Sequence, residues 1–234
     1  VLLTETSADA AAVPPLPVDE AELARLQAAV GGRPVWLAAS THAGEEEIAA
    51  DTHRILKAPH PGLLTVIVPR HAERGAGIAA LLRGRGLTVA RRAAGEAIVP
   101  ATDVYLADTM GELGLFYRLA GIAFMGKSLV PLGGQNPLEA ARLGSAIIHG
   151  PHMMNFEDVC ERLNAAGAAV RVANADGLRA AVARLIADGG ERARLAEAAR
   201  ALVEREAHVL DAVTAEIEAF LKPLFEERVA RART

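Results

Sequence analysis

The 234-residue sequence is poor in aromatic and sulfur-containing side chains. Aromatic residues make up 3% of it, so the hydrophobic core has to be built from Ala, Leu, Val and Ile. The single cysteine, Cys160, excludes an intrachain disulfide and a metal site made of several cysteines. It fits a reducing compartment, and its helical surroundings are typical of a core residue rather than a nucleophile.

Membrane and export signals are also missing. No apolar run approaches the roughly 18–20 residues that a membrane helix needs. Residues Val1–Thr4 have neither the basic region nor the full apolar core of a signal peptide, and no initiator Met precedes them. We therefore expect a soluble chain that is either a fragment of a longer protein or a processed one.

The sequence has no strong excess of charge. Its formal net charge of −4 argues against a dedicated nucleic-acid-binding protein. Hydrophobic residues at 51% and charged residues at 23% are typical of a globular chain. No His, Asp or Glu residues recur at a convincing metal-binding spacing, so we expect no metal site. No cofactor is expected either. A nucleophile elbow of the G-x-S-x-G type is absent as well.

Short apolar segments alternate with amphipathic ones along the chain. The expected strands are Val35–Ala39, Leu64–Val68, Leu87–Ala90, Val104–Ala107, Ile122–Met125, Ala146–His149 and Ala169–Val172. The expected helices are Asp19–Val30, Gly44–Leu56, Glu73–Arg83, Leu113–Leu119, Pro137–Leu143, Phe156–Ala165, and Asp176–Leu221 with a break near Gly189–Gly190. Strands that are apolar on both faces and separated by helices indicate a parallel sheet covered on both sides.

The predicted fold class is therefore α/β, a Rossmann-like doubly wound parallel sheet with helices on both faces. This domain is expected to span residues 19–222. Residues 1–18, rich in Ala and Pro, are interpreted as a linker or irregular lead-in, and residues 223–234 as a frayed charged tail.

In a doubly wound sheet, ligands bind beyond the carboxyl ends of the strands, so the loops there form the candidate site. Ser40, Thr41 and His42 follow the first strand. The two hydroxyl residues either cap the next helix or, together with His42, line the floor of a pocket.

Pro69, Arg70 and His71 follow the second strand. An arginine at the end of a strand can hold a phosphate or a carboxylate through a forked pair of hydrogen bonds. The alternative is a solvated helix start with a salt bridge to Glu73. Clustered basic residues are poorly explained by packing at this position, so we favour the anion site.

Met110, Gly111 and Glu112 lie between the fourth strand and a short helix. Gly111 lets the backbone approach a ligand closely, and the helix start exposes free N–H groups that suit a phosphate. The segment matches neither the G-x-G-x-x-G fingerprint nor a phosphate loop ending in Lys-Ser/Thr. A plain strand-to-helix turn is the alternative.

The segment from Gly133 to Glu139 carries the strongest signal. Asn136 is the expected N-cap, with Pro137 in the first turn. Glu139 either completes a capping box or accepts hydrogen bonds from both hydroxyls of a ribose, because a carboxylate offers several acceptor sites. Possible further contacts in the neighbouring loops are Gly134, Gln135 and Asn155.

Together these loops resemble one family, the 3-deoxy-D-manno-octulosonic acid (Kdo) transferases. The matching segments, in the order of the family, are Ala39–His42 with Gly44–Glu46, Pro69–His71 with Glu73–Arg74, Thr109–Leu113, Gly133–Gly134 with Asn136–Glu139, and Gly150–His152 with Asn155–Phe156. They lie within residues 33–221. Gln135 stands where the family usually has His, which bears on one ligand contact, and Ala72 where it usually has Pro, which should matter little.

The resemblance implies the GT-B arrangement, in which two Rossmann-like domains face a cleft, with this chain as the C-terminal domain. In that family the C-terminal domain binds the donor CMP-Kdo. An N-terminal domain outside this chain binds the lipid A precursor, carries the acidic general base and provides a membrane anchor. The implied reaction is inverting, metal-independent transfer of Kdo in lipopolysaccharide synthesis at the cytoplasmic face of the bacterial inner membrane.

The resemblance also assigns roles within this chain. Arg70 would hold the phosphate or the Kdo carboxylate, the Gly111 and Glu112 N–H groups and the Asn136 helix start the phosphate, and Glu139 the ribose. The donor-binding set is Ser40, Thr41, Pro69, Arg70, His71, Met110, Gly111, Glu112, Asn136 and Glu139, with His42, Gly134, Gln135 and Asn155 as possible additions. No catalytic residue is expected in this chain, which should bind the donor without turnover.

Two other functions stay open from the sequence. One is a different GT-B glycosyltransferase that uses a UDP-sugar. The other is a non-catalytic nucleotide-binding or interaction module, whose long Ala-rich segment Asp176–Leu221 would pack on a partner.

Overall fold

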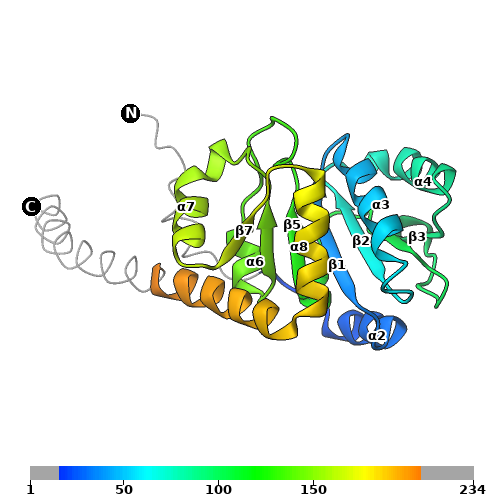
Figure 1. The fold of residues 1–234 in the computed structure, drawn as a ribbon. Helices are drawn as coiled ribbons and strands as arrows, with labels where there is room; N and C mark the ends of the chain where they lie inside the picture. The colour runs from blue at the N-terminus through cyan, green and yellow to red at the C-terminus, as the bar shows by residue number, and fades with distance from the viewer. Residues whose placement is uncertain (1–15, 207–234) are drawn as a thin grey trace, which may run out of the picture.

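The computed structural model describes residues 16–206, which form a parallel sheet with helices on both faces (Figure 1). Its seven strands are all parallel and lie in the order β3-β4-β2-β1-β5-β6-β7. The strands are β1 (Val35–Thr41), β2 (Leu64–Pro69), β3 (Val89–Arg91), β4 (Val104–Leu106), β5 (Ile122–Met125), β6 (Ala146–His149) and β7 (Ala169–Arg171). The predicted α/β fold with a doubly wound parallel sheet is confirmed.

Helices connect or flank the strands. They are α2 (Glu20–Val30), α3 (Glu45–Leu56), α4 (Gly75–Gly84), α5 (Leu113–Leu119), α6 (Leu138–Arg142), α7 (Glu157–Ala165) and α8 (Ala175–Ala187). Short 3₁₀ turns at Ala72–Arg74 and Met154–Phe156 precede α4 and α7, and a third at Arg92–Ala94 lies between β3 and β4. A further helix, residues 189–206, follows α8 and is orange in Figure 1.

Alternate side chains of each strand feed two separate core layers. On β1, Leu37 and Ala39 belong to the layer under α2, α5, α6 and α7, whereas Trp36 and Ala38 belong to the layer under α3, α4 and α8. Figure 1 shows α3 and α8 in front of the sheet and α6 behind it. The prediction that the strands are apolar on both faces is therefore confirmed, because both faces are covered.

The break in the last helical segment lies at Asp188, one residue before the predicted glycine pair. Asp188 is extended, and its carboxylate accepts a hydrogen bond from the N–H of Glu191 at 2.8 Å, which caps the next helix. Gly189 and Gly190 are helical. The cap rather than the glycines ends α8, and the predicted continuation beyond residue 206 lies outside the described residues, as do residues 1–15 and the predicted tail.

Strand ends differ from prediction by one or two residues where a turn competes for the backbone. β1 runs on to Thr41, and β3 starts at Val89 rather than Leu87. The N–H of Leu87 donates to the carbonyl of Leu82 at 3.3 Å, so Leu87 still belongs to the turn that closes α4. The apolar pattern alone does not tell whether the Leu87 N–H bonds within this turn or within the sheet.

The chain leaves the central strands toward opposite faces of the sheet. After β1 it enters α3 on one face, and after β5 it enters α6 on the other. Neighbouring parallel strands whose connections diverge in this way mark the point at which doubly wound sheets bind ligands. The carboxyl ends of β1 and β5, toward the top of Figure 1, are therefore the place to build the site.

Candidate functional site

The carboxyl end of β1 carries a bulge at Ser40. In the β1–β2 ladder Ala39 pairs with Val68 and Thr41 with Pro69, so Ser40 is skipped and adopts a left-handed φ of 53°. Gly126, directly after β5, donates to the carbonyl of Ala39 at 2.8 Å, and a Cβ there would lie 2.6 Å from the same oxygen. The loops after β1 and β5 thus meet in close backbone contact.

The carboxylate of Glu45 fastens these two loops together. It is buried, and its Oε2 accepts the N–H groups of His42 at 3.0 Å and Lys127 at 2.7 Å. Its Oε1 accepts those of Ser128 and Leu129, both at 3.1 Å. Burial raises the pKa of Glu45, and the N–H donors act against that rise. Glu45 is therefore a structural acceptor whose oxygens are already occupied.

Glu46, the next residue, is buried beside the second loop. Its carboxylate accepts the Thr41 hydroxyl at 3.0 Å and a forked pair from Arg74 at 2.9 and 3.2 Å. The Thr41 side chain is thus committed to Glu46, which leaves its backbone as the part that borders the site.

The idea that Ser40 and Thr41 cap α3 is wrong. The N-cap is Gly44, whose N–H donates to the carboxylate of Glu47 at 3.1 Å. β1 continues through the bulge at Ser40 to Thr41, three residues before the N-cap, and the Thr41 hydroxyl donates to Glu46.

Arg70 is the free cation at the end of β2. Its N–H donates to the carbonyl of Thr41 at 3.0 Å, and its side chain is exposed. Glu73 pairs with His71 at 3.4 Å instead. Within residues 16–206 the Arg70 guanidinium has no ion-pair partner. The salt-bridge alternative applies to His71, and Arg70 remains available to an anion.

His42 is a neutral group among cations. Its Nε2 is buried and has no hydrogen-bond partner among the described residues, and its ring meets that of His71 edge-on at 5.7 Å between centroids. Burial first, and then the positive charges of Lys127, His71, Arg74 and Arg70, lower the pKa of His42. These groups therefore converge on one region of the surface.

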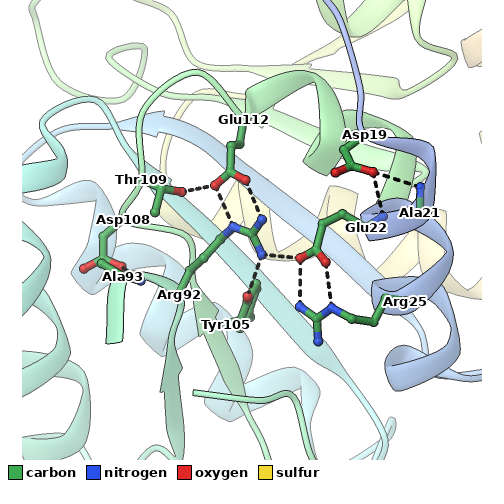
Figure 2. A network of polar contacts seen from close by, with 10 residues as sticks. All are labelled: Asp19, Ala21, Glu22, Arg25, Arg92, Ala93, Tyr105, Asp108, Thr109 and Glu112. Atoms are coloured by element: carbon green, nitrogen blue, oxygen red, sulfur yellow. Dashed lines mark hydrogen bonds and ion pairs between the residues drawn. The ribbon is translucent and has the colours of Figure 1, made fainter. Parts of the chain in front are cut away.

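The turn before α5 is held by a network that Figure 2 shows. Arg92 forms a forked pair with Glu112, and Glu112 also accepts the Thr109 hydroxyl. Arg92 donates to Glu22 of α2 at 2.7 Å as well. The bonds from Arg25 and then Arg92 lower the pKa of Glu22 to about 2. The Glu112 carboxylate is thus occupied by Arg92 and Thr109. Only the backbone N–H groups of this turn remain to bind a ligand.

Pro137, not the predicted Asn136, directly precedes α6, but Asn136 still bonds to the first turn. Asn136 Oδ1 accepts the N–H of Leu138 at 2.9 Å. Glu139 does not complete a capping box, because its carboxylate accepts Arg142 at 2.8 Å and lies 3.4 Å from the N–H of Leu16. The helix has five residues, Leu138–Arg142, and is shorter than the predicted Pro137–Leu143.

The α5 and α6 starts lie on one edge and one face of the sheet. Both follow carboxyl ends of parallel strands, and both helices pack in the same core layer. Leu16 bridges them: its carbonyl accepts Arg118 of α5 at 3.0 Å, and its N–H approaches Glu139 of α6. The described part of the lead-in thus passes between the two turns.

The two-glycine loop rests on the segment after β6. Gly133 and Gly134 have φ values of 100° and 78°. The N–H of Asn155 donates to the carbonyl of Gly133 at 3.0 Å, and that of Gly134 to the carbonyl of Lys127 at 2.9 Å. A Cβ on Gly133 would lie 2.8 Å from the Asn155 amide nitrogen. The structure therefore brings Asn155 and Gly134 to the same edge as Asn136, with Gln135 partly exposed between them.

The remaining predicted residues lie at the same edge. Pro69 is the last, buried residue of β2, whereas the Met110 side chain is 69% exposed. In residues 16–206 no group of three His, Cys, Asp or Glu side chains is placed to hold a metal ion. No helix in this part of the chain is long and apolar enough to cross a membrane.

Lys127 lies at the same edge but was not among the site residues predicted from the sequence. The letters from Gly121 to Ser128 match the phosphate-loop pattern G-x-x-x-x-G-K-S, which is the signal that points to it. No phosphate loop forms, because Ile122–Met125 are strand β5 and the buried Ser128 hydroxyl donates to the carbonyl of Met125 at 2.5 Å. Lys127 itself follows the strand with a left-handed φ of 63°.

Comparison with known proteins gives consistent relatives, although no protein-family model matches the sequence. A 3-deoxy-D-manno-octulosonic acid transferase of Haemophilus influenzae is 42% identical over 167 residues, which are 71% of this chain and 39% of the relative. The Kdo transferase of Bordetella pertussis is 38% identical over 190 residues, which are 80% of this chain and 44% of that relative. The chain spans less than half the length of these relatives.

Among solved structures, the C-terminal CMP-Kdo binding domain of WaaA from Acinetobacter baumannii is 30% identical with a TM-score of 0.72. The match covers 81% of this chain and 96% of that domain. Anabaena Alr3699/HepE in complex with UDP and glucose has a TM-score of 0.58 at 15% identity, covering 87% of this chain and 53% of HepE, which is a likeness of fold.

Proposed function

The chain belongs to the 3-deoxy-D-manno-octulosonic acid transferase family as the counterpart of its C-terminal domain, and from this premise we propose that it binds the nucleotide-sugar donor CMP-Kdo. The observation that carries the proposal is the match to almost the whole of a C-terminal CMP-Kdo binding domain, at 30% identity over 96% of its length. The relatives with bound UDP share only the fold.

The geometry supports the same ligand class. The α5 and α6 starts present backbone N–H groups at one edge, and Asn136 bonds to the first turn of the second. Arg70 adds an exposed guanidinium without an ion-pair partner in the described chain. N–H groups at helix starts and an arginine are the groups that bind a nucleotide phosphate.

In this proposal the same groups serve the reaction. Cleavage of the bond between sugar and phosphate leaves negative charge on CMP, and preorganised N–H donors and a guanidinium stabilise charge that develops there. The stabilisation comes from this chain's own residues, so we propose that transfer needs no nucleotide-bound metal. That transfer proceeds with inversion is proposed from the resemblance to the family alone.

Glu139 is proposed to hold the ribose. Its carboxylate lies partly buried beside the segment at Leu16 and shares a hydrogen bond with Arg142. Ribose hydroxyls would bind the lone pairs that Arg142 and the Leu16 N–H leave free, since a carboxylate has about four acceptor positions.

Binding of the acceptor substrate is not assigned to this chain. We propose that an N-terminal domain of the full-length enzyme binds the lipid A precursor, supplies the general base and faces the inner membrane from the cytoplasmic side. This chain then binds donor without turnover. Full transferase activity of the chain alone, supplied with donor and acceptor, would contradict that division of labour.

Calorimetric titration with CMP and with UDP tests the proposal directly. We expect CMP to bind more tightly than UDP, and Arg70→Ala to weaken CMP about ten-fold or more, because a charge-assisted bond to the phosphate is lost. The matched control is Arg54→Ala, which removes an exposed arginine of α3 paired with Asp51 and should leave CMP affinity unchanged.

A clear preference for UDP would remove the Kdo assignment and favour a UDP-sugar enzyme. If neither nucleotide bound, an interaction module would be the better description. Equal effects of the two arginine substitutions would remove Arg70 from the site.

A further inference from the structure

Lys127 occupies the strand end opposite Arg70. β1 lies between β2 and β5 in the sheet, so residues just after β2 and β5 flank the bulge at the end of β1. Arg70 follows β2 and Lys127 follows β5 by two residues. Two basic residues therefore flank the Ser40–His42 segment, one on each side.

The backbone at Lys127 is held in a conformation that a lysine adopts at a cost. Its φ of 63° lies in the left-handed region, which is unfavourable for a residue with a Cβ atom. The conformation is imposed by both neighbours: the N–H of Lys127 donates to Glu45 at 2.7 Å and its carbonyl accepts Gly134 at 2.9 Å. A glycine would satisfy the same two bonds, so the backbone gives no reason for a lysine side chain.

The charges around the site leave two cations uncompensated. Arg74 is neutralised by Glu46, and His71 lies 3.4 Å from Glu73. The Glu45 carboxylate lies next to Lys127, but it accepts hydrogen bonds from backbone N–H groups and forms no ion pair with the lysine side chain among the described residues. Within residues 16–206 neither the Lys127 ammonium nor the Arg70 guanidinium has an ion-pair partner.

We propose that Lys127 is a specificity residue that binds the carboxylate of the donor's sugar, while Arg70 and the helix starts bind the phosphate. This inference rests on the proposed function. A nucleotide sugar of this class carries two adjacent anions, the phosphodiester and the sugar carboxylate, and the site presents two unpaired cations on either side of one strand end. The lysine thereby favours acidic sugars over neutral ones.

His42 reports the convergence of these groups independently of the ion pairs. Among the neighbouring charges, Lys127 lowers the pKa of His42 most, and Arg70 lowers it as well.

Titrations of CMP-Kdo and of CMP against three chains test the inference: the unsubstituted chain, Lys127→Met and Lys127→Gly. Lys127→Met removes the charge and keeps a long side chain, whereas Lys127→Gly also relieves the backbone. We expect both variants to bind CMP-Kdo about ten-fold more weakly and CMP within about three-fold of the unsubstituted chain. The melting temperature of Lys127→Gly should be equal or higher, which separates loss of binding from loss of fold.

Equal weakening of CMP and CMP-Kdo would place Lys127 at the phosphate and overturn the inference, as would unchanged binding of both ligands. In either case the proposed donor binding would stand, because the unsubstituted chain still binds. Absence of binding by the unsubstituted chain would remove the proposed function and this inference together.

Discussion

At the scale of single residues, Glu45 shows how a charged side chain organises the site without contacting a ligand. Four backbone N–H groups from two loops converge on one buried carboxylate. The carboxylate is buried, and a buried donor left without an acceptor costs about 1–3 kcal/mol. The three glutamates at the start of α3 are therefore not simply a solvated face, because Glu45 accepts the hydrogen bonds that join the two loops.

Glu45→Gln should lower the free energy of unfolding by about 2–5 kcal/mol, since an amide presents N–H groups to N–H donors and has one acceptor oxygen instead of two. Urea unfolding at pH 7 measures the loss. Glu47→Gln is the matched control on the same turn, because Glu47 accepts one bond, from Gly44, and should cost less than about 1 kcal/mol. Equal losses in the two variants would show that the converging bonds carry no special weight.

At the scale of elements, the loop from β5 to α6 is shaped by contacts with two other loops. Its backbone is bonded to Glu45 at one end and to the segment after β6 at the other. Gly134 is buried with φ at 78°, and a Cβ there would overlap the sulfur of Met153 and lie 2.9 Å from its Cε. The loop thus needs glycine for conformation and for space at once.

Gly134→Ala and Gly144→Ala separate these two requirements. Gly144 has a φ of 75°, but a Cβ added there would meet nothing within 4 Å, so its variant should lose only about 1–2 kcal/mol for the left-handed backbone. Gly134→Ala should lose more, and the displaced loop should also weaken CMP binding several-fold. Unfolding and CMP titration measure both. CMP affinity lost equally in the Gly144 variant would contradict a local effect of the loop.

At the scale of the whole molecule, the two core layers enclose histidines that fold in the neutral form. His53 Nδ1 lies 2.9 Å from the Thr65 hydroxyl, and His149 Nδ1 lies 2.8 Å from the carbonyl of Gly150. Burial lowers the pKa of both, although Asp103, 3.3 Å from His53 Nε2, acts in the opposite direction. Burial therefore disfavours the protonated form of both imidazoles in the native chain.

Stability should therefore fall as the pH is lowered from 7 to 5.5. The unfolded chain binds protons at these histidines as the pH passes about 6.5, while the native chain does not, so acid favours unfolding by up to about 1.4 kcal/mol per pH unit for each. Urea unfolding across this range gives the slope. A double variant, His53→Gln with His149→Gln, should flatten it. A slope unchanged in the double variant would contradict the assignment.

The fold was predictable because its signals are local. Apolar runs such as Leu64–Pro69 and amphipathic stretches such as Glu45–Leu56 carry their period within the segment, so the order of elements and the parallel sheet followed from them. The bond from Asn136 to the first turn of α6 was predictable for the same reason, since its partner Leu138 is two residues away. Boundaries failed where a turn and a strand compete for one backbone group, as at Leu87.

The sequence by itself determined which loops meet at the carboxyl edge of the sheet, because parallel strands align their ends. Only the tertiary structure decided which charged side chains are consumed there and which stay free. Glu45 reaches Lys127 across 82 positions in the chain, and Arg92 reaches Glu22 across 70. The physical reason is that the partner of a charge is set by packing between distant segments, which no local period encodes.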